Sequence, residues 1–127
     1  MALIIADTDV LIDALRGREP ARARIAEALA AGQLATTAVT AFELRSGADT
    51  DRTRSAVEQL LAPLEILPFD DAAAIRAGKL RRTLEAAGTP IGMGDYLIAG
   101  ICLTHGARLA TRNRSHFARV SGLVLVE

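Results

Sequence analysis

The chain has 127 residues, which is enough for one domain, residues 1–127, that buries roughly two thirds of its unfolded surface. Fifteen basic and fifteen acidic residues balance, which excludes the global field that by itself predicts binding to nucleic acid or membranes. A single cysteine excludes a disulfide framework and a CxxC metal site, and no run approaches the roughly 18 apolar residues of a membrane span, so we expect a cytoplasmic protein without membrane contact.

Five short apolar runs along the chain predict strands. They lack the alternation of apolar and polar residues that marks a sheet with one solvated face. This pattern favours a parallel sheet covered on both faces. The runs span residues 3–6, 34–37, 65–67, 109–111 and 123–126.

Helical patterns fill the intervals between these runs. The segment 70–88 begins with Asp70, a favourable N-cap, and repeats apolar residues at alternating spacings of four and three. Ile75 lies off that apolar stripe, so we expect it to have a second contact, such as a dimer partner. The segment 94–106 is apolar nearly all the way round, which predicts a buried helix. Further helices are predicted over 19–31, from Ala41 onward and over 53–61.

This order of strands and helices predicts an α/β fold. We expect a three-layer sandwich in which a mostly parallel central sheet is flanked by helices. In folds of this kind, ligands bind outside the carboxyl ends of the strands.

Three acidic residues lie in segments that are otherwise core. Asp7 follows the first strand, Glu43 lies near the start of a helix after the second strand, and Asp95 opens the buried helix. Taken singly, Asp7 and Asp95 have an ordinary interpretation as helix caps, and Glu43 as the partner of an arginine such as Arg45. Taken together, we expect them at one edge of the sheet, where two carboxylates about 4 Å apart repel by roughly 4 kcal/mol at an effective dielectric constant of about 20. Oxygen ligands without cysteine or paired histidine select a hard cation, so the three acids predict a site for Mg²⁺, with Mn²⁺ as a substitute.

The segment LATRNRSHF leaves the fourth strand at the same edge. Asn113 offers its amide to a metal-bound water or to substrate, and Arg112 and Arg114 offer charge to phosphate; an ordinary turn is the alternative. His105 and His116 lack the spacing of metal ligands, so we expect both to be surface or partly packed residues.

Three stretches, IIADTDVLIDALRG, TTAVTAFELRSGA and GTPIGMGDYLIAGICLTHGARLATRNRSHFARVSGLVLV, resemble the PIN-domain ribonucleases. Within that family the chain resembles the VapC-type toxins of type II toxin–antitoxin systems, and the resemblance covers the whole chain. It implies a PIN-like fold and catalytic acids at Asp7, Glu43 and Asp95, all three of them metal ligands. The fourth acidic position of the family falls on Asn113, and we expect this departure to weaken metal binding without abolishing it.

The resemblance implies Mg²⁺-dependent hydrolysis of RNA. Attack by a metal-activated water is expected, because no pair of histidines is present at a spacing that would activate the ribose 2′ oxygen. The predicted products therefore carry 5′-phosphate and 3′-hydroxyl ends. Candidate RNA contacts are Arg16, Arg112 and Arg114, with solvated surface charge as the alternative for each. The family also implies a homodimer and an antitoxin whose carboxyl-terminal segment covers the acidic cleft.

Several interpretations stay open at this stage. Asp9 is either an extra group near the metal or a helix residue that faces solvent, and Asp13 is expected at the surface near Arg16. The opening DTDVLI resembles the DxDx[TV] motif of haloacid-dehalogenase-like phosphatases, although Leu11 stands where that motif has Thr or Val. A phosphate-accepting receiver domain would need a lysine after the last strand, whereas Lys79 lies within a predicted helix. A PIN-like module that binds RNA or a partner without cutting is the third alternative.

Overall fold

The computed structural model describes residues 3–126, and in them four strands form one parallel sheet. The strand order is β3-β2-β1-β4, so the order reverses between β1 and β4. In parallel sheets, a crevice opens at the carboxyl ends of the strands where the order reverses. The strands are β1 (Ile4–Ala6), β2 (Leu34–Thr37), β3 (Glu65–Leu67) and β4 (Arg108–Ala110).

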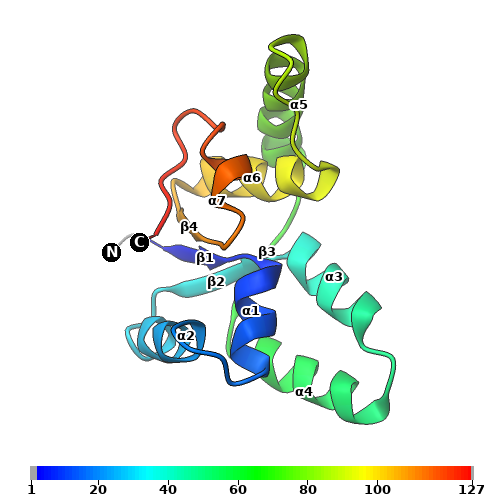
Figure 1. Cartoon of the computed structure of the whole chain (residues 1–127), viewed down its shortest axis with the longest axis vertical. Coiled ribbons are helices and arrows are strands. Elements are labelled where there is room, and N and C mark those ends of the chain that lie inside the picture. The colour runs from blue at the N-terminus through cyan, green and yellow to red at the C-terminus, as the bar shows by residue number, and fades with distance from the viewer. Residues whose placement is uncertain (1–2, 127) are drawn as a thin grey trace.

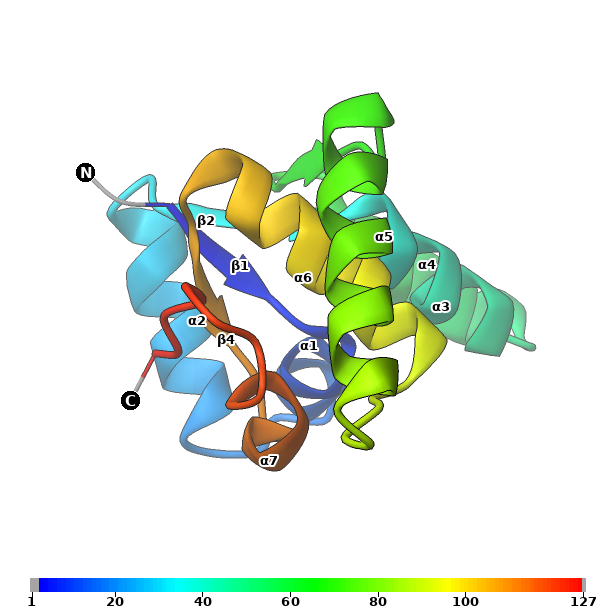
Figure 2. The ribbon, with the colours of Figure 1, turned by 90° about the horizontal axis from the view of Figure 1, so that it is seen from above.

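Helices cover both faces of the sheet, which confirms the predicted three-layer α/β sandwich. Figure 1 shows α1, α2 and α4 below the sheet and α5, α6 and α7 above it, with α6 between the sheet and α5. The view from above in Figure 2 shows α6 lying across the strands with α5 beside it. The helices are α1 (Thr8–Leu15), α2 (Ala21–Ala30), α3 (Ala38–Gly47), α4 (Asp51–Leu61), α5 (Asp71–Ala86), α6 (Met93–His105) and α7 (Arg114–Phe117).

The strands divide the core into two apolar clusters. Successive residues of a strand point to opposite faces of the sheet. Ile5 accordingly packs in the cluster that contains Ile98 and Phe117, whereas Ala6 packs on the other face with Leu11. All these side chains are buried, and the lack of alternation in the sequence of β1 therefore reflects burial on both faces.

Polar side chains fix where the helices begin. The Asp70 carboxylate accepts a hydrogen bond from the Ala73 N–H at 3.0 Å, which confirms the predicted N-cap of α5. The Thr37 hydroxyl accepts from the Thr40 N–H at 3.0 Å, so α3 begins directly after β2 rather than near Ala41 as predicted.

Helix α6 is buried, as its all-round apolar sequence predicts. Gly100 allows α5 to approach it closely, because a Cβ at this position would lie 2.7 Å from the Ala73 carbonyl oxygen and 2.8 Å from the Ala77 Cβ. Cys102, in the same helix, is fully buried, and burial raises the pKa of its thiol to about 12.

Two segments differ from the prediction. Residues 123–126 were expected to form a strand, but they form a single parallel bridge, between Leu125 and Leu109. Strand β4 has three residues, of which Arg108 and Ala110 bond toward the β1 side, so only Leu109 is left to exchange two hydrogen bonds with Val124 and Val126. Residues 114–117 belong to the segment after the fourth strand, which was expected either to present site residues or to be an ordinary turn, and they form the short helix α7.

Ile75 projects from the outer face of α5 and is 66% exposed. The contact expected for it is therefore not supplied by residues 3–126, and the dimer partner stays a prediction. No helix within the described part of the chain is both long enough and apolar enough to span a membrane.

Candidate active site

The candidate site lies where the strand order reverses, beside the ends of β1 and β4. The Asp7 N–H donates to the Ala110 carbonyl oxygen at 2.9 Å, which joins the two strand ends. The Asp7 carboxylate caps α1 by accepting from the Thr8 N–H at 2.8 Å, and its second oxygen accepts from the Thr111 hydroxyl at 2.7 Å. Asp7 is therefore a helix cap, as one interpretation of the sequence held. Unlike most caps, which lie at the surface, Asp7 is buried and only 6% exposed.

Burial raises the pKa of Asp7 to about 6. The hydrogen bond from Thr111 opposes this shift, whereas the negative charges of Asp9 and Asp95 add to it. Ionised Asp7 is thus disfavoured by both desolvation and like charge, and a bound cation would relieve both.

Glu43 reaches the site through Thr8, the residue next to Asp7. The Thr8 hydroxyl donates to Glu43 Oε1 at 2.8 Å and lies 3.1 Å from the Thr40 hydroxyl. A Cβ on Gly94 would lie 3.8 Å from Glu43 Oε2, so the Glu43 carboxylate also lies beside the first turn of α6. Arg45, offered by the sequence as an alternative partner of Glu43, instead forms a two-bond pair with Glu58, each bond 2.9 Å.

Asp95 lies in the first turn of α6, whose N-cap is Gly92. The cap interpretation of Asp95 is therefore wrong. A Cβ on Gly92 would lie 3.2 Å from Asp95 Oδ2, so the Asp95 side chain lies directly against the start of α6. The same carboxylate oxygen lies 2.9 Å from His116 Nδ1 and 3.4 Å from Asn113 Nδ2, and these two nitrogens are 3.0 Å apart.

Two groups at the site were not predicted from the sequence. Thr111 ends the fourth apolar run at the same sheet edge as Asp7, which was the available signal for its contact. His116 follows Asn113 by three residues, a spacing that places both side chains on one side of a helical turn. The side chain of His116 is 38% exposed, so it is partly packed as expected, but its packing partner is a candidate catalytic acid.

The chemistry of these side chains suits a hard divalent cation, because the three candidate ligands offer only carboxylate oxygens. In their present positions, however, no three His, Cys, Asp or Glu side chains of residues 3–126 form a cluster that could hold a metal ion. Glu43 is exposed and has a long, rotatable side chain. Holding one ion between Asp7, Glu43 and Asp95 would therefore require these carboxylates to move from their present positions.

Two acids of α1 hold the loop that follows β4. The Arg112 N–H donates to the Asp9 carboxylate at 3.1 and 3.3 Å, and Arg112 Nε lies 2.8 Å from Asp13 Oδ2. Asp13 also has a second, longer contact, 3.7 Å between its Oδ1 and Arg18 Nη1. Asp13 is only 8% exposed, so its expected surface position is wrong. Asp9 likewise does not simply face solvent.

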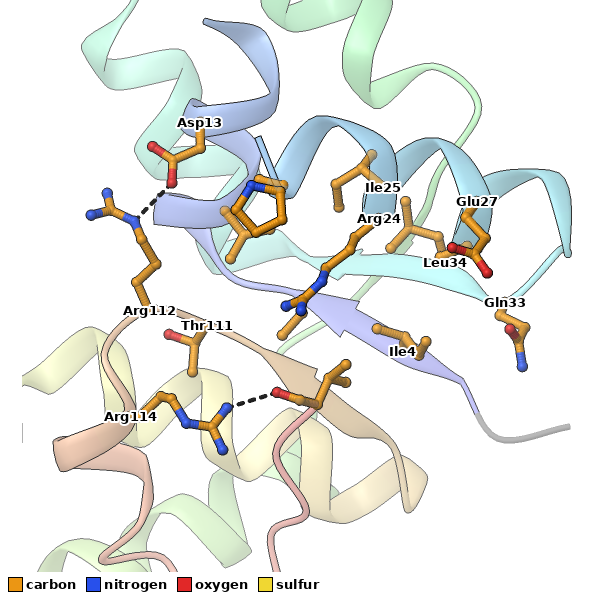
Figure 3. Close-up of a pocket in the computed structure, with 16 residues that line it drawn as sticks. Ile4, Asp13, Arg24, Ile25, Glu27, Gln33, Leu34, Thr111, Arg112 and Arg114 are labelled. Atoms are coloured by element: carbon orange, nitrogen blue, oxygen red, sulfur yellow. Dashed lines mark hydrogen bonds and ion pairs between the residues drawn. The ribbon is translucent and has the colours of Figure 1, made fainter. Parts of the chain in front are cut away.

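The arginines predicted to bind RNA occupy different positions. Arg114 donates to the Val126 carbonyl oxygen at 2.7 Å. Arg24, Arg112 and Arg114 line a cavity of about 780 Å³. In Figure 3, Arg112 and Arg114 lie at one end of this cavity and Arg24 of α2 points into it. Arg16 is exposed at the carboxyl end of α1, about 12 Å along the helix axis from the Asp7 end. Their role in RNA binding stays a prediction.

Comparisons with known proteins identify the family and the fold of the chain. The family model described as PIN domain matches residues 4–123. Ribonuclease VapC10 of Mycobacterium tuberculosis is 39% identical over 115 residues, which cover 91% of this chain and 86% of that protein. The tRNA(fMet)-specific endonuclease VapC of Shigella flexneri is 32% identical over 127 residues, covering 97% of this chain and 96% of that protein. A chain in the crystal structure of DNA-bound VapBC from Salmonella typhimurium superposes with a TM-score of 0.90 at 30% identity, over 99% of this chain and 98% of that chain.

Proposed function

Because the chain belongs to the PIN-domain family, we propose that it is a VapC-type ribonuclease, the toxin of a type II toxin–antitoxin pair. The observation that most supports this function is the buried Asp7 carboxylate, whose pKa is raised by desolvation and by the nearby charges of Asp9 and Asp95. A buried acid among other acids at the carboxyl edge of a parallel sheet suits cation-assisted chemistry on phosphate.

The proposed cofactor is Mg²⁺, for which Mn²⁺ can substitute, and the proposed ligands are Asp7, Glu43 and Asp95. When bound, Mg²⁺ supplies a water of lowered pKa and offsets the charge that develops on the phosphate. The residues of the chain orient the ligands. The Thr111 hydroxyl fixes the Asp7 carboxylate, and Asn113 with His116 holds Asp95.

The proposed reaction is hydrolysis that leaves 5′-phosphate and 3′-hydroxyl ends. Attack by the ribose 2′ oxygen instead requires an acid and a base, commonly two histidines. Among the described residues, His116 is the histidine beside the site, while His105 ends α6 about 15 Å along the helix axis from Asp95. A 2′,3′-cyclic phosphate product would contradict the proposed mechanism.

Asp95→Asn tests the site assignment. Mutation of a residue that only orients a metal ligand typically lowers activity roughly 10-fold to 100-fold. Loss of the ligand Asp95 itself should lower the cleavage rate by at least this much. The matched control is Asp71→Asn, because Asp71 lies in the first turn of α5 as Asp95 does in α6, but is exposed. Cleavage of RNA should also stop in EDTA and return with Mg²⁺. If Asp95→Asn cleaves at the normal rate with a normal melting curve, the assignment is wrong.

We further propose that a cognate antitoxin covers the acidic edge with its carboxyl-terminal segment. The superposed Salmonella chain is part of a VapBC complex, which supports a partner of this kind. An arginine of the antitoxin would be attracted to Asp7, Glu43 and Asp95 and would block either metal or substrate. Co-expression with the product of the adjacent reading frame, followed by pull-down and a cleavage assay, tests the partner.

The RNA target requires an experiment in cells. The Shigella relative is named for cleavage of tRNA(fMet), so a structured RNA is a reasonable first candidate. RNA 5′ ends mapped after brief induction, with Asp95→Asn as the reference, would identify the target and the cleaved bond. The proposed location is the cytoplasm, where the free thiol of Cys102 stays reduced.

A further inference from the structure

The loop of residues 111–113 carries two side chains of the candidate site, Thr111 and Asn113. Thr111 donates to Asp7, and Asn113 lies 3.4 Å from Asp95. The residue between them, Arg112, points the other way, toward α1. We infer that the ion pair between Asp13 and Arg112 positions the candidate active site by holding this loop against α1. The inference rests on the proposed function, because it concerns the same site.

The hydrogen bonds of the loop show how such an effect would be transmitted. The Arg112 N–H donates to Asp9, and the Asn113 N–H donates to the Thr111 hydroxyl at 3.0 Å. That hydroxyl is the group that donates to Asp7. A shift of the Arg112 backbone would therefore move the Thr111 hydroxyl and the Asn113 amide together, and so disturb both Asp7 and Asp95.

The burial of Asp13 explains why the ion pair would resist movement of the loop. The Asp13 side chain is 12% exposed, whereas that of Arg112 is 62% exposed. Removing Arg112 would leave the buried Asp13 carboxylate without this partner, which costs more than losing one partner of an exposed pair. Arg18 offers only a longer contact of 3.7 Å to Asp13, so it replaces Arg112 poorly. Asp9 and Asp13 are separated by four residues and therefore face the loop from one side of α1.

The ion pair itself stands apart from the reacting groups. Asp13 lies six residues after Asp7, about 9 Å along the axis of α1. Figure 3 shows the pair at one end of the cavity, between α1 and the segment after β4, with Thr111 beside it. Asp13 and Arg112 are therefore positioning residues in this account, since they act through Thr111 and Asn113.

Asp13→Asn should have different effects if Arg112 positions the loop and if Arg112 contacts RNA directly. If Arg112 binds RNA, Asp13→Asn releases its charge and should leave binding unchanged or tighter, while Arg112→Gln raises KM. If the pair positions the loop, both variants should lower kcat with little change in KM. Misplacement of site groups by about 1 Å can cost about 100-fold in rate, and for a loosened loop we expect about tenfold.

The experiment compares Asp13→Asn, Arg112→Gln and the double variant with the wild type in Mg²⁺. The matched control is the Asp51–Arg54 pair of α4, which has the same 2.8 Å contact but is exposed, changed to Asp51→Asn and Arg54→Gln. Steady-state cleavage gives kcat and KM. Hydrogen exchange of the Arg112 and Asn113 amides reports the loop directly and needs no activity.

The inference is supported if both single variants lower kcat about tenfold, the double variant is no worse than either, and the two amides exchange about tenfold faster than in the control variants. It is overturned if Asp13→Asn leaves kcat unchanged while Arg112→Gln raises KM, or if amide exchange is unchanged in both variants. A wild-type protein that cleaves no RNA overturns the proposed function instead, and the positioning role is then judged by amide exchange alone.

Discussion

At the scale of single residues, Asp7 combines a structural and a chemical role. It caps α1 and joins the ends of β1 and β4, yet its carboxylate is buried with a pKa raised to about 6. Its ordinary pKa is 3.8, so the folded protein binds this proton more tightly than the unfolded chain does. Ionised Asp7 therefore destabilises the fold by about 3 kcal/mol above pH 6 in the absence of a cation, and the penalty disappears below the unfolded value.

Asp7→Asn should accordingly stabilise the metal-free protein. In EDTA, the free energy of unfolding of the variant should exceed that of the wild type by about 1–3 kcal/mol at pH 8 and match it below pH 4. Urea denaturation across this pH range measures the difference, which should grow between pH 4 and pH 6. Mg²⁺ should raise the stability of the wild type at pH 8 but not that of the variant. A difference that does not change with pH would contradict the raised pKa.

The sequence identified the acids of the candidate site and Asn113, but it did not identify Thr111 and His116, which contact Asp7 and Asp95. Asp7, Glu43 and Asp95 stand out locally because each interrupts an apolar segment. The contacts of Thr111 with Asp7 and of Arg112 with Asp13 link residues about a hundred positions apart, and no local pattern encodes such pairs. The expected surface position of Asp13 was wrong for that reason.

At the scale of elements, the close packing of α5 against α6 depends on Gly100. Gly100→Ala would force a Cβ against the backbone of α5, so we expect the free energy of unfolding to fall by about 2 kcal/mol. Gly78→Ala, in α5, is the control: no atom lies within 4 Å of its Cβ position, and the gain in helix propensity should stabilise the protein by up to about 1 kcal/mol. Denaturant unfolding measures both, and equal effects would contradict this account of the packing.

The elements themselves were largely readable from the sequence. Each strand of the sheet coincides with a short apolar run, and α6 was recognised because its apolar residues surround it. The run at 123–126 failed because its pattern is that of a strand while β4 provides only Leu109 for pairing. The helix after β1 was expected only through Asp7 as its cap and through the interpretation of Asp9 as a helix residue, without predicted bounds, and α1 spans Thr8–Leu15.

At the scale of the whole molecule, Ile75 provides a test of the homodimer predicted from the sequence. It faces directly away from the buried face of α5, formed by Ala73, Ala77 and Leu84, and is 66% exposed. Ile75→Glu should shift the protein from dimer to monomer in sedimentation or light scattering, without lowering the melting temperature of the monomer. Leu29→Glu, on α2, is the control and should leave the dimer intact. A wild-type protein that is monomeric would contradict the dimer, and a dimeric Ile75→Glu would place its interface elsewhere.

The burial of Cys102 has a practical use. It is the single cysteine of the chain. Its thiol, on α6, is buried in the protein core, and burial raises its pKa to about 12. Thiol reagents attack the thiolate, so alkylation of the native protein should be slow and limited by opening of the core. The alkylation rate of Cys102 therefore measures the rate at which the core opens. A cysteine introduced at the surface could be labelled with a fluorophore without labelling of Cys102.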